Sequence, residues 1–269
     1  MLRHIKNIFP FDVTLRDGLQ SIKREYSLLE KKNILYNIIN LHNPKSIEIG
    51  SLVSDNVLPQ MKYSKELYNY AINNNNWKHI DFYLLIPNFK MFEKNKDINF
   101  HNISLISSVS DSFQKKNIKL SLNETKDEID KFNNNLNLKN IKLYLSCINK
   151  CPIDGIIDND IIIDEIYYYH NLKNITNICL SDTTGELSFD NFKYIIDKII
   201  KHVDPKKISL HLHYNENEVF NTLNIMQYAI DNNINIFDVS LLENAGGCSV
   251  TIENNILKPN LNYNIFNLL

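Results

Sequence analysis

Short runs of apolar, β-branched and aromatic residues recur along the chain, and segments with helical spacing separate them. Several of these runs are apolar almost throughout, which is typical of parallel strands buried on both faces. We therefore predict a β-strand for each run, and the eight predicted strands are Phe11–Leu15, Ser46–Ile49, Ile80–Ile86, Ile103–Ser107, Ile141–Ser146, Asn177–Ser181, Ile208–Leu212 and Ile236–Leu241.

The segments between these runs carry helix signals. Ser27 and Glu30 have the spacing of a capping box, which marks the start of a helix. Pro205 closes a later helical segment, because proline cannot continue a helix. Apolar stripes with a 3.6-residue period follow Ser27, precede Pro205 and recur once more: Ile34, Leu35, Ile38 and Ile39; Phe189, Phe192, Ile196, Ile199 and Val203; and Val219, Leu223, Met226 and Ile230.

Strand and helix alternate eight times, which favours a (β/α)₈ TIM barrel over an open, doubly wound sheet. No shift in composition marks a linker, so residues 1–269 are expected to form a single domain. After the last predicted strand only about thirty residues remain, too few for both an ordinary loop and a long closing helix. The final helix is therefore expected to be shortened, or supplied by a partner chain.

Composition narrows the class of protein. Hydrophobic residues make up 43% and charged residues 22%, which are globular values. The net charge of −2 disfavours nucleic acid as a partner, and no apolar run is long enough to cross a membrane. The first residues, MLRHIKNIFPF, lack the features of a targeting peptide, so a cytoplasmic location is expected. Four cysteines are too sparse for a disulfide framework, and Cys147 and Cys151 lack the second pair that a structural zinc site needs.

Polar side chains follow several of the predicted strands. A TIM barrel carries its chemistry just beyond the carboxyl ends of its strands. Acids, bases and a thiol fall there or within the adjoining strand: Arg16, Asp17, Glu48, Asp182, His211, His213 and Cys248.

The His-x-His pair is the most informative of these groups. Because side chains on a strand alternate between faces, His211 and His213 point the same way. Two imidazoles beside a carboxylate such as Asp17 make a mixed nitrogen and oxygen site for a divalent cation. The alternative is a pair of surface histidines at a strand edge. Their place at the end of a buried strand, with acids on neighbouring strand ends, favours the metal site.

Each of the other groups also has a structural interpretation. Arg16-Asp17 alone could be a surface ion pair in a turn. Glu48 lies in the apolar stretch SIEIG, where a buried acid needs a partner, and an arginine across the barrel mouth would supply one. Asp182 could cap the helix that follows it, and Cys248 could be a small buried apolar residue.

Four short motifs match a known family. DVTLRDGLQ, IEIG, SDTTG and HLH together resemble the metal-dependent TIM-barrel lyases named for their Asp, Arg and Glu, a family that includes isopropylmalate and homocitrate synthases. Within it, IEIGSLVSDNVLPQM, SDSFQKKNIKLSLNET, YLSCINKCPIDG and NAGGCS resemble segments of the HMG-CoA lyases. The likeness is collinear from Phe11 to Ser249, which makes it far more specific than one motif.

The resemblance implies roles for individual residues. It implies a divalent-metal-dependent lyase, with Mg²⁺ or Mn²⁺ as the usual ion, that cleaves 3-hydroxy-3-methylglutaryl-CoA, or a similar 3-hydroxyacyl-CoA, to acetyl-CoA and acetoacetate. Asp182 or a histidine would take the substrate's hydroxyl proton. The residues matched are Asp17, His211 and His213 as metal ligands, Asn254 or Asn255 as a fourth ligand, Arg16 at the enolate, Glu48 and Asp182 as acids, and Cys248 as the loop cysteine. Asp12, Gln20 and Thr183 lie in the matched stretches and are candidates for substrate contacts. Barrels of this family often pair, so a homodimer is possible.

Two other functions stay open. DxTLRDGxQ is closer to acetyl-CoA-dependent condensing synthases, but NAGGCS and the paired Cys147 and Cys151 favour the lyase, and the chain has no room for the extra region usual in synthases. The third possibility is a non-catalytic barrel retained for binding. The shortened loop after Cys248 is its main support.

Overall fold

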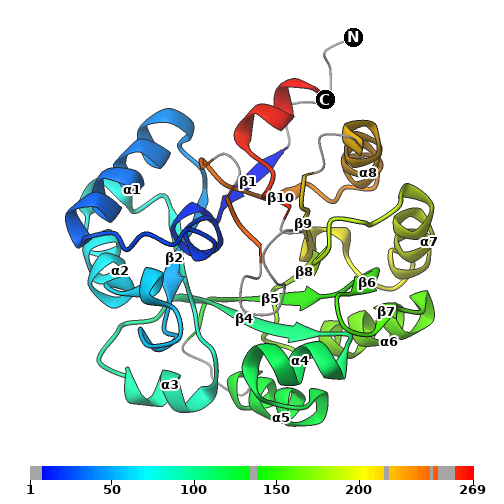
Figure 1. Ribbon diagram of the computed structural model, residues 1–269, viewed down its shortest axis with the longest axis horizontal. Coiled ribbons are helices and arrows are strands. Elements are labelled where there is room, and N and C mark those ends of the chain that lie inside the picture. Colours follow the sequence, from blue (N-terminus) through cyan, green and yellow to red (C-terminus); the bar gives the residue numbers. More distant parts are fainter. Residues whose placement is uncertain (1–7, 134–137, 215–217, 243–244, 248–257) are drawn as a thin grey trace.

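The computed structural model describes residues 8–133, 138–214, 218–242, 245–247 and 258–269. Within these ranges eight parallel strands close into a barrel in the order β1-β10-β9-β8-β5-β4-β3-β2 (Figure 1). The predicted TIM barrel is therefore confirmed. The barrel strands are β1 (Phe9–Asp12), β2 (Ser46–Ser51), β3 (Asp81–Leu85), β4 (Asn102–Ser108), β5 (Asn140–Ser146), β8 (Asn177–Ser181), β9 (Ile208–His211) and β10 (Ile236–Val239).

Helices surround the strands in Figure 1. They are α1 (Leu28–His42), α2 (Ser64–Ile72), α3 (Phe89–Lys94), α4 (Asp111–Ile118), α5 (Leu122–Asn133), α6 (Asn159–His170), α7 (Phe189–Ile199) and α8 (Val219–Asp231). The predicted capping box begins α1, since the Glu30 N–H donates to Ser27 Oγ and the Ser27 N–H donates to Glu30 Oε2. A small antiparallel hairpin, β6 (Lys150–Cys151) and β7 (Gly155–Ile156), lies outside the barrel sheet.

The two faces of the strands are packed differently. Outward-facing residues such as Leu143 and Val239 are fully buried against the helices, and each contributes about 1.5–3 kcal/mol by burial. The barrel interior is more polar. Asp238 of β10 reaches Lys142 of β5 although β9 and β8 lie between these strands, so both side chains point into the barrel. The interior therefore supplies charged groups beneath the carboxyl ends of the strands.

The first strand ends earlier than its apolar pattern predicts. Phe11–Leu15 was expected, but β1 stops at Asp12, and Thr14–Gly18 form a π-helical turn. Asp12 accepts hydrogen bonds from the Thr14 N–H at 2.9 Å and the Thr14 hydroxyl at 3.0 Å, which bends the backbone out of the sheet. This turn places Arg16 and Asp17 over the barrel mouth.

The last strand is also shorter than predicted, ending at Val239 instead of Leu241. The reason is that the Ser240 N–H donates to Leu261 of the C-terminal segment at 2.8 Å, and the Leu241 N–H donates to Thr14 Oγ1 at 2.8 Å. These hydrogen bonds to Leu261 and Thr14 take the place of further pairing within the sheet.

The described C-terminal residues 258–269 carry a short 3₁₀-helix, Tyr263–Asn267, in place of a long closing helix. The expected shortened helix is thus confirmed. Tyr263 stacks on His42 with ring centroids 3.7 Å apart, and its hydroxyl donates to Asp12 at 2.8 Å. In this way the segment covers the region around β1.

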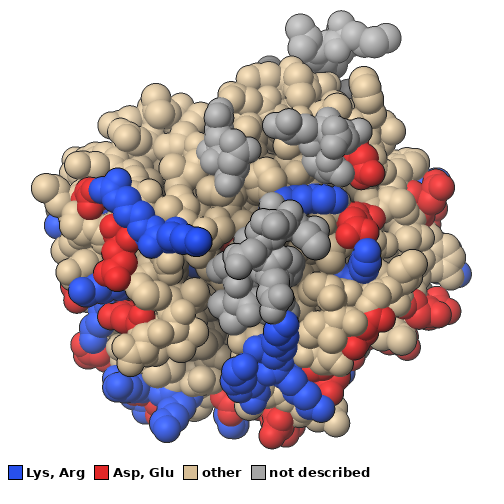
Figure 2. Space-filling view, in the orientation of Figure 1, with Lys and Arg blue, Asp and Glu red and all other residues tan. Residues whose placement is uncertain are grey.

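Surface charge is mixed on the face seen in Figure 2, where acidic and basic side chains are interspersed. This agrees with the net charge of −2. Within the described ranges, every helix is too short or too polar to cross a bilayer.

Candidate active site

A cavity of about 130 Å³ lies at the carboxyl ends of the strands. One wall is apolar and includes Leu58, Met61 and Phe113, from the segments after β2 and β4. The opposite side is polar. Six of the predicted site residues line it together: Arg16, Asp17, Gln20, Thr183, His211 and His213.

Asp17, His211 and His213 form a compact group that could hold a metal ion. One ligand atom from each lies within 4.8 Å of the others, and all three residues are buried. Asp17 Oδ2 and His211 Nε2 are 3.7 Å apart. His213 Nε2 has no hydrogen-bond partner among the described residues, although it is buried. Two imidazoles and a carboxylate with an orphaned nitrogen are a donor set that fits a divalent cation.

The Nδ1 atom of each histidine has a hydrogen-bond partner on the side of the ring away from Asp17. His213 Nδ1 donates to the Asp182 carbonyl at 2.7 Å, and His211 Nδ1 lies 3.1 Å from Asp238 Oδ2. Both rings therefore direct Nε2 toward Asp17. Burial, as the main cause, and a smaller electrostatic effect of neighbouring His211 lower the pKa of His213 to about 4, so this ring is neutral at pH 7 and able to act as a ligand.

Asp17 is kept ionised in this buried place. Burial favours its neutral form, but Arg16 and the two histidines hold the pKa of Asp17 below its ordinary range. The Gly247 N–H also donates to Asp17 Oδ2 at 3.0 Å. Asp17 can therefore act as an anionic ligand.

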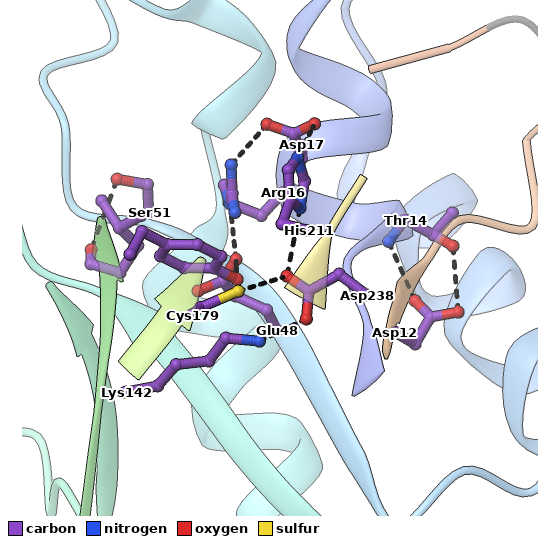
Figure 3. A network of polar contacts seen from close by, with 12 residues as sticks. Asp12, Thr14, Arg16, Asp17, Glu48, Ser51, Lys142, Cys179, His211 and Asp238 are labelled. Carbon is purple, nitrogen blue, oxygen red and sulfur yellow. Dashed lines mark hydrogen bonds and ion pairs between the residues drawn. The ribbon is translucent and has the colours of Figure 1, made fainter. Parts of the chain in front are cut away.

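Arg16 is 6% exposed and bonded on several sides. Its Nε donates to Glu48 and its Nη1 to Asp17 (Figure 3). Its guanidinium lies 4.7 Å from the centre of the Tyr144 ring. The Tyr144 hydroxyl also donates to Glu48, at 3.0 Å. Although burial opposes its charge, Glu48 raises the pKa of Arg16 above its already high value. The arginine partner predicted for Glu48 is thus confirmed.

A glycine allows the Thr14–Gly18 turn to pack this closely. A Cβ on Gly18 would lie 2.7 Å from Ser240 Oγ, just after β10, so a larger residue there would force either the Ser240 side chain or the turn to move. Such π-turns insert an extra residue per turn and recur at functional sites. Here the turn directs two successive charged residues, Arg16 and Asp17, into one cavity.

Two predicted residues have mainly structural contacts. Asp182 accepts backbone N–H bonds from Glu186 at 3.2 Å and Leu187 at 3.0 Å, as its interpretation as a helix cap implies. Burial nevertheless raises the pKa of Asp182 to about 6. Asp12 is bonded to Thr14 and Tyr263. Neither Asp182 nor Asp12 is among the residues that line the cavity.

Three predicted residues, Cys248, Asn254 and Asn255, lie outside the described residues. The structure instead reveals Asn260, which sequence reasoning missed. Its backbone bridges that of His213, its side chain lies against Gly246, and it is 4% exposed. Among the described residues, neither polar atom of its amide has a partner. Asn260 stands in no motif, so the path of the C-terminal segment alone places it here.

Lys142, Tyr144 and Asp238 were also not among the residues predicted from the sequence. Lys142 and Asp238 form an ion pair inside the barrel, and Lys142 lies over the Phe11 ring at 3.4 Å. Against the effect of burial, Lys142 lowers the pKa of Asp238. For Lys142 and Asp238 the sequence did contain a signal. Each is a single charged residue within an apolar strand, in IKLYLS and FDV, and such a residue needs a buried partner.

The sequence matches one family over most of its length. The HMGL-like family model matches residues 7–232. A mitochondrial hydroxymethylglutaryl-CoA lyase from Macaca fascicularis is 26% identical over 246 residues, which cover 90% of this chain and 73% of that protein. A cytoplasmic 3-hydroxy-3-methylglutaryl-CoA lyase from Homo sapiens is 26% identical over 242 residues, covering 88% of this chain and 62% of that protein.

Solved structures show the same fold. An HMG-CoA lyase from Brucella melitensis superposes with a TM-score of 0.81 at 23% identity, covering 96% of this chain and 87% of that one. An HMG-CoA lyase from Acinetobacter baumannii, in complex with coenzyme A and 3-methylmalate, also has a TM-score of 0.81 at 23% identity, covering 97% of this chain and 82% of that one. At these identities the likeness establishes the fold, which agrees with the resemblance found in the sequence.

Proposed function

The chain belongs to the HMGL-like family, and on this basis we propose that it is a divalent-metal-dependent carbon–carbon lyase. Its proposed substrate is HMG-CoA, cleaved to acetyl-CoA and acetoacetate, or a similar 3-hydroxyacyl-CoA. The names of its relatives support this lyase activity. The observation that carries the proposal is a buried Arg16 beside the Asp17, His211 and His213 group in one cavity.

Asp17, His211 and His213 would hold the ion, for which we propose Mg²⁺ or Mn²⁺. When bound, such an ion acts as a Lewis acid that stabilises negative charge on the substrate's C3 oxygen. The candidates for accepting the C3 hydroxyl proton are Asp182 and the two histidines. Both histidines would bind the ion through Nε2 and already have a partner at Nδ1. Asp182, which directly precedes the cavity residue Thr183, is therefore the acceptor that we favour.

Arg16 would stabilise the other end of the substrate. As the C2–C3 bond breaks, its electrons move onto the thioester carbonyl, where a fixed guanidinium stabilises the enolate. Among the described residues, Glu48 and Asp17 engage Nε and Nη1, and we propose Nη2 as the donor to the substrate oxygen. Because Glu48 and the Tyr144 ring hold the guanidinium, it does not need to reorganise during the reaction. We propose Cys248 as the acid that protonates the enolate carbon and so completes acetyl-CoA, as the resemblance implies.

The activity can be tested directly on the purified chain. We expect acetoacetate and acetyl-CoA to form from HMG-CoA with Mg²⁺ or Mn²⁺, activity to be lost in EDTA, and activity to return when either ion is added. If no acetoacetate forms but acetyl-CoA and a 2-oxo acid yield free CoA, the protein is a condensing synthase. No turnover in either direction, together with no bound ion, would support the non-catalytic barrel.

Asn260 is a better candidate than Asn254 or Asn255 for the fourth ligand, because its amide is buried and unpartnered beside His213 within the described structure. We expect Asn260→Ala to weaken Mn²⁺ binding by at least about tenfold, the lower end of effects at the shell around a metal site. Titration followed by the electron paramagnetic resonance signal of free Mn²⁺ measures this. Asn264→Ala, at an exposed position of the same segment, is the control. Equal affinities for the two variants would remove Asn260 from the site.

Location and assembly are further parts of the proposal. Relatives include proteins named cytoplasmic and others named mitochondrial, so the cytoplasmic location stays a prediction. The single domain and the homodimer likewise stay predictions.

A further inference from the structure

A buried carboxylate lies directly behind His211. Asp238 of β10 is 1% exposed, and its Oδ2 is 3.1 Å from His211 Nδ1 on the neighbouring strand β9 (Figure 3). The Cys179 thiol also donates to Oδ2, at 3.7 Å. The other carboxylate oxygen, Oδ1, accepts from Lys142 Nζ. Oδ1 of Asp238 therefore accepts from Lys142, while Oδ2 faces His211 and Cys179.

Lys142 reaches Asp238 across the barrel interior. Its ammonium lies 3.4 Å from the centre of the Phe11 ring and 4.8 Å from that of Tyr144, so aromatic faces surround it. A buried ion pair adds little net stability, because desolvating both charges offsets their attraction. Its position is the more informative feature: Lys142 has only donors, so it orients Asp238 by engaging Oδ1 and leaves Oδ2 for His211.

This arrangement selects one tautomer of His211. An ionised carboxylate only accepts hydrogen bonds, so the proton of a neutral His211 ring resides on Nδ1. The lone pair then lies on Nε2, 3.7 Å from Asp17 Oδ2. His213 also has its proton on Nδ1, because this atom donates to the Asp182 backbone carbonyl, which no substitution can remove. His211 alone depends on a side chain for its orientation.

We propose that Asp238, itself oriented by Lys142, is a positioning residue that keeps His211 Nε2 directed at the metal site formed with Asp17 and His213. This inference rests on the metal site of the proposed function. Carboxylates behind metal-bound histidines fix the ring and increase its basicity, and their loss typically weakens metal binding 10- to 100-fold.

Asp238→Asn tests this inference sharply. Lys142 can only donate, so it would take the single carbonyl oxygen of the new amide and turn the NH₂ group toward His211 Nδ1. Nδ1 would then accept, and the proton would move to Nε2, which could no longer bind the ion. We expect the metal-free Asp238→Asn protein to bind Mn²⁺ about 10- to 100-fold more weakly, measured by the free-Mn²⁺ resonance signal without substrate.

A second variant separates orientation from damage to the core. In Lys142→Met/Asp238→Asn the lysine no longer occupies the amide oxygen introduced at position 238. That oxygen can then accept from His211 Nδ1, so most of the Mn²⁺ affinity should return. Cys179→Ala removes a contact to the same Asp238 oxygen without touching the His211 bond, and should bind Mn²⁺ like the unmodified protein. Asp238→Asn binding with unchanged affinity, or a double variant as weak as the single one, would overturn the inference.

The tautomer can also be read without metal or turnover. Nitrogen-15 spectra of the metal-free, histidine-labelled protein should show His211 protonated at Nδ1, and Asp238→Asn should show it protonated at Nε2. If Asp238→Asn does not fold, the spectrum of the unmodified protein decides, and a His211 proton on Nε2 there would refute the proposal. A protein with the expected tautomer and Mn²⁺ affinity that fails to cleave any thioester would refute the lyase activity and leave this inference standing.

Discussion

Replacing Arg16 with alanine is expected to lower the kcat for HMG-CoA cleavage by about 10³-fold, at the upper end of the loss seen when one pre-oriented donor is removed. The reason is that Arg16 is the one arginine or lysine among the described residues that line the cavity, and Glu48 and Tyr144 hold its guanidinium in place before substrate arrives. Steady-state kinetics at saturating Mn²⁺ would measure the effect. Arg24→Ala removes an exposed arginine a short distance along the chain and should leave kcat unchanged.

Arg16→Ala also leaves Glu48 as an unpaired carboxylate that is 0% exposed, which costs about 3–5 kcal/mol of folding stability. Urea denaturation would show this cost separately from the kinetic loss. The double variant Arg16→Met/Glu48→Gln also removes the negative charge of Glu48. It should recover the free energy of unfolding without recovering kcat. A kcat within tenfold of the unmodified protein in either folded variant would show that Arg16 does not stabilise the enolate.

His211→Ala is expected to abolish metal binding and turnover together. Loss of a ligand should exceed the 10- to 100-fold effect of outer-shell partners, so we expect Mn²⁺ affinity to fall by more than about 100-fold. The reason is geometric: His211 supplies one of the three ligand atoms that lie within 4.8 Å of one another. Calorimetric Mn²⁺ titration and acetoacetate formation are the two measurements.

His79→Ala is the matched control for His211, because His79 is exposed and lies just before β3, at the amino-terminal end of the barrel. It should retain both metal affinity and turnover. Added imidazole should restore part of the Mn²⁺ affinity of His211→Ala by occupying the vacated space. Tight Mn²⁺ binding by His211→Ala itself would mean that the ion is held elsewhere, and the proposed site would be wrong.

Much of the fold was predictable because it depends on local periodicity. Apolar runs separated by amphipathic helices allow few architectures, and strand ends in a parallel barrel must meet at one rim. The prediction was poorest where side chains compete with the sheet for backbone groups. Thr14 and Asp12 end β1 early by such bonds, and no pattern of apolar residues reports them.

The pairing of the two charged residues inside the barrel could not be predicted from the sequence, for a different reason. Lys142 and Asp238 are 96 positions apart, and each by itself was only a charged residue in an apolar strand. Pairing them requires the strand order and the register, since two other strands separate β5 from β10. Asn260 depends on the route of the C-terminal segment past His213, which the sequence does not encode in any short pattern.

By itself the sequence determined the barrel, the rim at which the candidate site lies, and the residue types gathered there, because periods of 2 and 3.6 residues act over short stretches of chain. Arg16, Asp17, Glu48, His211 and His213 were all identified at that level. Only the tertiary structure decided which atom of each is free to act: the π-turn directs Arg16 and Asp17 into one cavity, and contacts from Asp182 and Asp238 hold both histidine Nδ1 atoms. Hydrogen bonds between distant strands determine these orientations, and their donors and acceptors meet only when the barrel has closed.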